Sequence, residues 1–104
     1  MLSRSVFEVE EFMMQHVAGQ NQGKITLYAL STCGWCERTK KFLDNLGVEY
    51  SYVYVDLLQS DQRQSMVNEV RRWNPRCSFP TVVINDEVCV VGYNEQKIKK
   101  AIGI

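Results

Sequence analysis

Two cysteines with two residues between them stand in the sequence STCGWCERTKK, residues 31–41. A thiolate that attacks a disulfide needs a second thiol nearby to release the mixed disulfide, and a Cys-x-x-Cys pair supplies both groups. Cys33 would lie at a helix N-terminus, where unsatisfied backbone amides and the helix dipole favour an anion, so we expect a lowered thiol pKa. Cys36 would lie one turn further into the helix and be more buried. We therefore predict Cys33 as the nucleophile and Cys36 as the resolving thiol.

The same helix carries three basic residues whose role has two interpretations. Their charges could stabilise the thiolate or contact a partner, or they could form an ordinary solvated helix face. These residues are Arg38, Lys40 and Lys41.

The other two cysteines suggest weaker chemistry. A zinc site would need a second ligand pair beside the Cys-x-x-Cys, and the wide separation of Cys77 and Cys89 does not fit a zinc knuckle, so we expect no metal ligands. Cys89 lies in the apolar run VCVV, which predicts a buried core thiol. Cys77 stands three residues before Pro80. We expect it to be a spectator, because only Arg76 is near enough in sequence to lower its pKa.

Length and composition limit the class of protein. The chain has 104 residues, of which 45% are hydrophobic, and twelve acidic side chains balance twelve basic ones. This length fits one compact domain, and the balanced charge gives no overall attraction to nucleic acid or to an anionic membrane. No run of about 18 apolar residues could span a membrane, and the acidic N-terminus does not resemble a secretion signal. We expect a cytoplasmic monomer that binds neither nucleic acid nor membrane.

The first 23 residues have a pattern of their own. Ser5 and Glu8 form a potential capping box, and apolar residues then recur at helical spacing up to Gly19. The sequence GQNQGK, residues 19–24, is polar and has a glycine near each end. We predict an accessory helix and linker over residues 1–23 and the main domain over residues 24–104.

Residues 24–104 alternate between strand and helix patterns. β-branched and aromatic residues indicate the strands, and apolar residues at helical spacing indicate the helices. The expected strands cover residues 25–30, 49–57, 81–84 and 88–91, with a turn at Asn85-Asp86, and the expected helices begin near Cys36, Ser60 and Asn94.

This order of elements predicts an α/β fold. The first strand-helix-strand unit should be a right-handed parallel crossover, and the last two strands should form an antiparallel hairpin in the same sheet. The strands TVVI and VCVV are wholly apolar, which is typical of strands that helices cover on both faces. Pro80 would stand at the first position of a strand, where a residue without an amide hydrogen is tolerated and a cis bond would suit a tight entry.

Three motifs in this order, LYALSTCGWC, SFPTVV and VVGYNEQKI, resemble the glutaredoxins of the thioredoxin superfamily. The resemblance implies a thioredoxin fold with a central four-stranded mixed sheet, a redox-active Cys33–Cys36 disulfide, and a cis Pro80 packed against it. It also implies that the backbone of residues 79–81 pairs with the substrate, which would be a disulfide-containing protein or small molecule. The substrate-binding residues that it predicts are Thr32, Trp35, Phe79, Pro80, Thr81, Gly92, Tyr93 and Asn94.

Departures from the family pattern bear on the reductant. Glutathione-using glutaredoxins usually have a lysine three residues before the first cysteine, where this chain has Leu30, and often a Gly-Gly pair, where it has Gly92-Tyr93. The second change resembles the glutaredoxin-like electron donors of ribonucleotide reductase. We expect glutathione, although possible, to be a poor reductant, and a flavoprotein or ferredoxin-linked reductase, or another low-molecular-weight thiol, to act instead, with no bound cofactor. The dipeptide Gly34-Trp35 leaves an alternative, because similar family members carry a glutathione-bridged [2Fe-2S] cluster.

Overall fold

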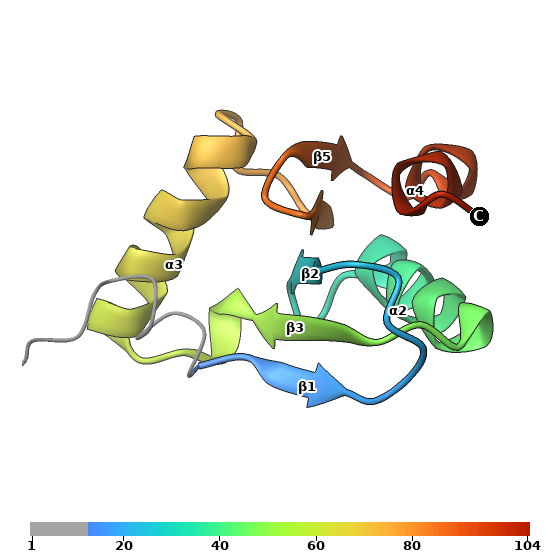
Figure 1. Ribbon diagram of the computed structural model, residues 1–104. Coiled ribbons are helices and arrows are strands. Elements are labelled where there is room, and N and C mark those ends of the chain that lie inside the picture. The colour runs from blue at the N-terminus through green and yellow to red at the C-terminus, as the bar shows by residue number, and fades with distance from the viewer. Residues whose placement is uncertain (1–12) are drawn as a thin grey trace, which may run out of the picture.

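The computed structural model describes residues 13–104, which form one five-stranded mixed sheet with helices on both of its faces (Figure 1). The strand order is β1-β3-β2-β4-β5. The strands are β1 (Gln15–Val17), β2 (Ile25–Ala29), β3 (Tyr50–Tyr54), β4 (Thr81–Ile84) and β5 (Val88–Val91). The helices are α2 (Gly34–Leu46), α3 (Ser60–Trp73) and α4 (Glu95–Ile102), and a short 3₁₀ turn η1 (Val55–Leu57) follows β3.

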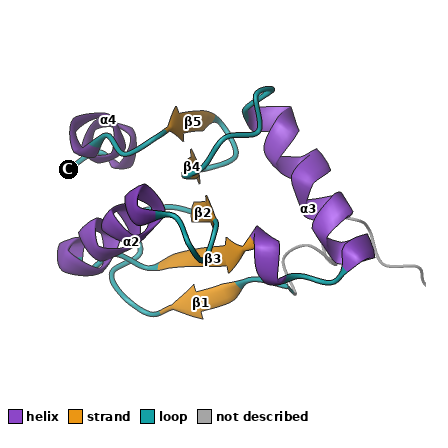
Figure 2. Ribbon diagram, turned by 180° about the vertical axis from the view of Figure 1, so that it is seen from behind, coloured by secondary structure: helices purple, strands orange, loops and turns teal. Residues whose placement is uncertain are grey.

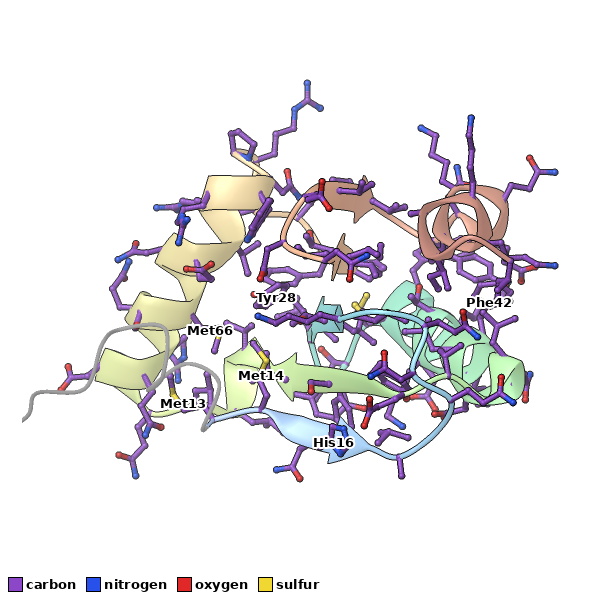
Figure 3. The ribbon with its side chains drawn as sticks, viewed as in Figure 1. Met13, Met14, His16, Tyr28, Phe42 and Met66 are labelled. Carbon is purple, nitrogen blue, oxygen red and sulfur yellow. The ribbon has the colours of Figure 1, made fainter. Side chains whose placement is uncertain are left out.

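The sheet separates two hydrophobic cores. Figure 2 shows α2 and α4 on one side of the sheet and α3 on the other. Neighbouring residues of a strand point to opposite faces, so Leu27 packs in the core under α2 and α4, whereas Tyr28 packs with Met66 of α3 (Figure 3). The predicted coverage of both faces is confirmed for the central strands β2 and β4, whose residues are all buried.

Capping and turn residues stand at several ends of the helices and strands. Gly47 ends α2 in the left-handed conformation with φ 70°, and Asn94 caps α4 by accepting a hydrogen bond from the Lys97 amide at 3.0 Å. The turn between the paired residues Ile84 and Val88 spans residues 85–87, and its Asn85 and Asp86 have positive φ values of 55° and 52°, which asparagine and aspartate tolerate better than most residues. β2 and β3 are parallel, with α2 as their crossover, and β4 pairs antiparallel with both β2 and β5. The predicted connectivity of the main domain is confirmed.

β5 forms at the predicted residues, but its predicted burial was wrong. Val88 and Val91 are 44% and 50% exposed, and Cys89 is half-buried rather than part of the core. β5 lies at the edge of the sheet, so the helices cover it less completely than β4. An apolar strand pattern therefore did not distinguish a central strand from an edge strand.

The N-terminal prediction fails over the residues that the structure describes. Gln15–Val17 is a strand paired antiparallel with β3, so the sheet has five strands rather than four; the remainder of the predicted helix, residues 5–12, lies outside the described residues. Pairing with the open edge of β3 thus outweighs the helical spacing of the apolar residues. A contact of 3.0 Å between His16 Nε2 and Glu49 Oε2 also joins this strand to the rest of the domain. The segment predicted as a linker is also bound to the domain. The Gln20 amide donates to the Gly47 carbonyl, and the Glu49 amide donates to the Gln20 carbonyl, both at 2.8 Å. Within residues 13–104, no helix has the length and apolar character that crossing a membrane requires.

Candidate active site

The Cys-x-x-Cys pair lies where β2 leads into α2. Cys33 is the N-cap residue of α2, with extended backbone angles, and its Sγ accepts a hydrogen bond from the Cys36 amide at 3.2 Å. A helix N-terminus with its free amides favours a negatively charged capping group. The position predicted for Cys33 is therefore observed, and its side chain is half-buried.

Cys36 lies in a different environment from its partner. It is 1% exposed and belongs to the core under α2 and α4. Burial, with a contribution from the hydrogen-bonded Cys33 thiol, raises the pKa of Cys36 to about 12. Cys36 thus keeps its proton at neutral pH, and none of the four cysteines forms a disulfide in this structure.

An exposed carboxylate holds the loop before Cys33. Asp56, in η1, accepts hydrogen bonds from the amide of Ser31 at 2.8 Å and from its hydroxyl at 2.5 Å. The Ser31 hydroxyl is the main cause that lowers the pKa of Asp56. Within the same loop, the Cys33 amide donates to the Leu30 carbonyl at 3.3 Å. The sequence interpretation missed this pair, although both residues follow the carboxyl ends of the adjacent parallel strands β2 and β3, where α/β proteins often place functional groups.

The loop before β4 carries Pro80. The Phe79–Pro80 peptide bond is cis, as the sequence had suggested, and the proline ring is buried. The Gly92 amide donates to the Pro80 carbonyl at 2.8 Å, which ties this loop to the turn that follows β5. Gly92 has φ 82°, in the left-handed region that favours glycine.

A buried amide holds this loop in place. Asn74, which is 4% exposed, directs Nδ2 at the carbonyl and hydroxyl oxygens of Ser78, at 3.2 and 3.0 Å, and at Thr81 Oγ1, at 3.1 Å. Thr81 Oγ1 in turn donates to the Ser78 carbonyl at 2.7 Å. Asn74 was not among the predicted site residues, and its only signal was a position between the end of α3 and the Ser-Phe-Pro motif.

Five of the predicted substrate-binding residues line one groove of about 270 Å³. These are Trp35, Phe79, Pro80, Gly92 and Tyr93. Trp35 is 58% exposed, and its ring stacks on Tyr93 with centroids 5.9 Å apart. The Cys-x-x-Cys helix, the proline loop and the turn after β5 therefore meet at this groove.

The other three predicted residues lie around the groove rather than in its lining. Thr32 is exposed in the loop before Cys33. The side chains of Thr81 and Asn94 are engaged within the fold, in the Asn74 network and in the α4 cap. Leu30 is partly buried against the α3 core and brings no charge to the site.

The basic residues of α2 face different surroundings. Lys40 lies 3.4 Å from Asp44 Oδ2 and 4.7 Å from the centre of the Tyr52 ring. Arg38 lies 5.0 Å from the centre of the Trp35 ring. Of the three cations, Arg38 is therefore the one in contact with the lining of the groove.

A helix-capping Cys-x-x-Cys beside a cis-proline, on a mixed sheet with helices on both faces, defines a thioredoxin-like redox protein. The glutaredoxin family model matches residues 25–89, and the chain belongs to the glutaredoxin family. The glutaredoxin of Methanosarcina mazei Go1 is 49% identical, with 88% of this chain and 89% of that chain covered and a TM-score of 0.83. Methanoredoxin of Methanosarcina acetivorans is 48% identical, with 83% and 90% covered and a TM-score of 0.80.

A more distant relative comes from a virus. The gene 56 protein of Mycobacterium phage D29 is 32% identical over 78 residues, which are 75% of this chain and 81% of that protein. The predicted family and fold class are confirmed.

Proposed function

We propose that the protein is a thiol-disulfide oxidoreductase that works through a Cys33–Cys36 dithiol cycle. The observation that carries this proposal is the inequality of the two thiols. Cys33 is partly accessible at the helix N-terminus and accepts the Cys36 amide hydrogen bond, whereas Cys36 is buried with a pKa raised to about 12. This difference supports Cys33 as the attacking thiol and Cys36 as the resolving thiol.

The cycle transfers two electrons in two exchanges. The Cys33 thiolate attacks one sulfur of the substrate disulfide, breaks the S–S bond and forms a mixed disulfide, while the departing sulfur leaves as a thiolate and takes a proton. Cys36 then loses its proton to the second substrate sulfur as its own sulfur attacks Cys33. The substrate leaves as a dithiol, and the protein holds a Cys33–Cys36 disulfide until a reductant supplies two electrons.

We infer that the groove beside Pro80 receives the substrate. Main-chain pairing along residues 79–81 would recognise an extended peptide with little demand on its sequence. Tyr93 and the exposed Trp35 ring supply apolar contact area at the edge of this groove. This lining suits disulfide-containing proteins as well as small disulfides.

We further propose that glutathione is a weak reductant here. Leu30 offers no cation to a glutathione carboxylate, and a hydrogen bond to a charged group contributes about 1.5–3 kcal/mol. A flavoprotein or ferredoxin-linked reductase, or another low-molecular-weight thiol, would then complete the cycle.

The decisive test separates the two thiols. The wild type should reduce a small neutral disulfide, Cys33→Ser should be inactive, and Cys36→Ser should accumulate a mixed disulfide on Cys33 that mass spectrometry detects. Cys89→Ser, on the far edge strand, is the matched control and should retain wild-type turnover. Normal turnover by Cys33→Ser, with the adduct on Cys36, would contradict the assignment. Visible absorption after anaerobic iron and sulfide loading with glutathione would instead favour a cluster carrier.

A further inference from the structure

A second groove adjoins the one beside Pro80. It has a volume of about 310 Å³ and is lined by Arg38, Lys41, Phe42, Asn45, Tyr93 and Glu95. Tyr93 lines both grooves, so they meet at its ring. Figure 3 shows Phe42, one of the lining residues, between α2 and α4. The second groove thus extends the substrate groove along α2.

The second groove carries an excess of positive charge. Arg38 and Lys41 are three residues apart, so they share one face of α2, and both are exposed. Among residues 13–104, the ion pairs of the lysines and arginines engage Lys24, Lys40 and Arg72, and neither Arg38 nor Lys41 has a carboxylate partner. The one acidic side chain of the lining, Glu95, accepts a hydrogen bond from the Tyr93 hydroxyl.

The rim between the grooves has the residue types that dominate binding interfaces. Trp, Tyr and Arg are enriched among residues that contribute most to protein association. Here Trp35 stacks on Tyr93, and the Arg38 guanidinium lies over the Trp35 ring, 5.0 Å from its centre. An aromatic pair with an exposed tryptophan, beside two cations that have no carboxylate partner, favours an acidic polypeptide over a basic one.

We infer that this surface, which comprises Trp35, Arg38, Lys41 and Tyr93 and which we call the α2 docking groove, receives an acidic segment of a protein disulfide substrate. The inference rests on the proposed function, because it names the kind of substrate that the dithiol reduces. Complementary charge steers the encounter and fixes the orientation of the bound chain.

The helix sets the spacing that the substrate must match. Arg38 and Lys41 follow Cys33 by five and eight residues, which is about 8 and 12 Å along α2 at about 1.5 Å per residue. An extended peptide advances about 3.3 Å per residue. The acidic residues should therefore stand about two to four positions from the reactive cysteine of the substrate.

The test compares synthetic peptides that carry one cysteine in a mixed disulfide with 2-mercaptoethanol. One peptide has aspartates two to four positions from the cysteine, a second has asparagines there, and a third has the aspartates eight to ten positions away. Pre-reduced protein is mixed with each peptide, and the second-order rate constant is measured in a single turnover, so that no reductase is needed. The readout is the ratio of the rate constants for the acidic and neutral peptides.

We expect the near-aspartate peptide to react about five- to tenfold faster than the neutral one at low salt, as two exposed charge pairs of this kind allow. The ratio should fall toward one near 1 M salt, where the screening length is about 3 Å. The double variant Arg38→Gln, Lys41→Gln should also bring it close to one. Lys40→Gln is the matched control, because Lys40 faces Asp44 and Tyr52 and should leave the ratio unchanged.

The outcomes separate this inference from the proposed function. Equal reduction of all three peptides by the wild type would overturn the docking groove and leave the oxidoreductase intact. A ratio that persists in the double variant, or a preference for small anionic disulfides without one for acidic peptides, would also overturn it. Failure to reduce even the neutral peptide would overturn the proposed function together with this inference.

Discussion

The two loops that meet at the dithiol are held in different ways. The loop before Cys33 is held by Asp56, an exposed carboxylate that binds Ser31, whereas the loop before Pro80 is held by Asn74, a buried amide that binds Ser78 and Thr81. Water can replace the partners of an exposed group but not those of a buried one, so the loss of a buried partner costs more. The Asn74 network should therefore determine stability, and the Asp56–Ser31 pair should adjust the position of the Cys33 loop.

The largest effect is expected from Asn74→Ala. The substitution removes the hydrogen bonds of Nδ2 and leaves Thr81 Oγ1 short of a partner in the protein interior, so the free energy of unfolding should fall by about 2–4 kcal/mol. Urea denaturation measures the change. Asn68→Ala, at an exposed position of α3, is the control and should change the free energy of unfolding by less than about 0.5 kcal/mol. Equal effects of the two substitutions would show that the buried network contributes little.

The next largest effect is expected from a substitution in the Cys33 loop that changes how well glutathione acts as the reductant. Leu30→Lys should raise glutathione-dependent reduction of a small mixed disulfide up to about tenfold, because a cation would then stand three residues before Cys33. The assay follows initial rates with glutathione and a coupled reductase. Leu57→Lys adds the same charge at a position that is already 67% exposed and should have no such effect. Efficient glutathione use by the wild type, with no gain from the lysine, would refute the argument.

Asp56→Asn should have a smaller effect on stability that depends on pH. The Asp56 pKa is lowered in the folded protein, so its contribution is present above the unfolded pKa of about 3.9 and is lost as the pH falls through the folded value. At pH 7 the variant should lose about 0.5–1 kcal/mol, a figure reduced for the exposure of the carboxylate.

The difference between wild type and Asp56→Asn should shrink below about pH 4. Ser31→Ala should give a smaller loss, because the amide of residue 31 can still donate to Asp56. The double variant should be less destabilised than the sum of the two single variants, because both affect the hydrogen bond between the Ser31 hydroxyl and the Asp56 carboxylate. If the difference in the free energy of unfolding between wild type and Asp56→Asn stayed constant down to pH 2.5, the role given to the ionised carboxylate would be contradicted.

The smallest effect is expected from Cys77→Ser. Cys77 contributes its backbone amide to the Asn74 loop, through a 2.8 Å hydrogen bond to the Asn74 carbonyl, and this bond does not use the thiol. Turnover of a small disulfide should stay within about twofold of the wild type, as it should for Cys89→Ser. A loss beyond tenfold, about 1.4 kcal/mol of barrier, would mean that the Cys77 thiol takes part in the cycle.

Much of the fold followed from short-range signals. Residue types that are favoured at helix ends, turns and N-caps stand at Gly47, Asn85-Asp86 and Asn94, so these boundaries could be predicted from the neighbouring residues alone. The N-terminal segment lacked such a signal. Helical spacing favoured a helix there, but the open edge of β3 binds Gln15–Val17 as a strand. Sheet pairing joins residues distant in sequence, and the local pattern does not contain it.

The sequence by itself determined the Cys-x-x-Cys pair, its place at a helix N-terminus and the proline loop, because each depends on residues close together in the chain. Three such local motifs, taken in their order, also indicated the family. Only the tertiary structure decided that Asp56 holds Ser31, 25 residues away, and that Trp35 stacks on Tyr93. It also decided which cations of α2 line the second groove and which one pairs with Asp44. These contacts depend on how the helices and the turn after β5 pack on the sheet, and that packing is a property of the whole chain.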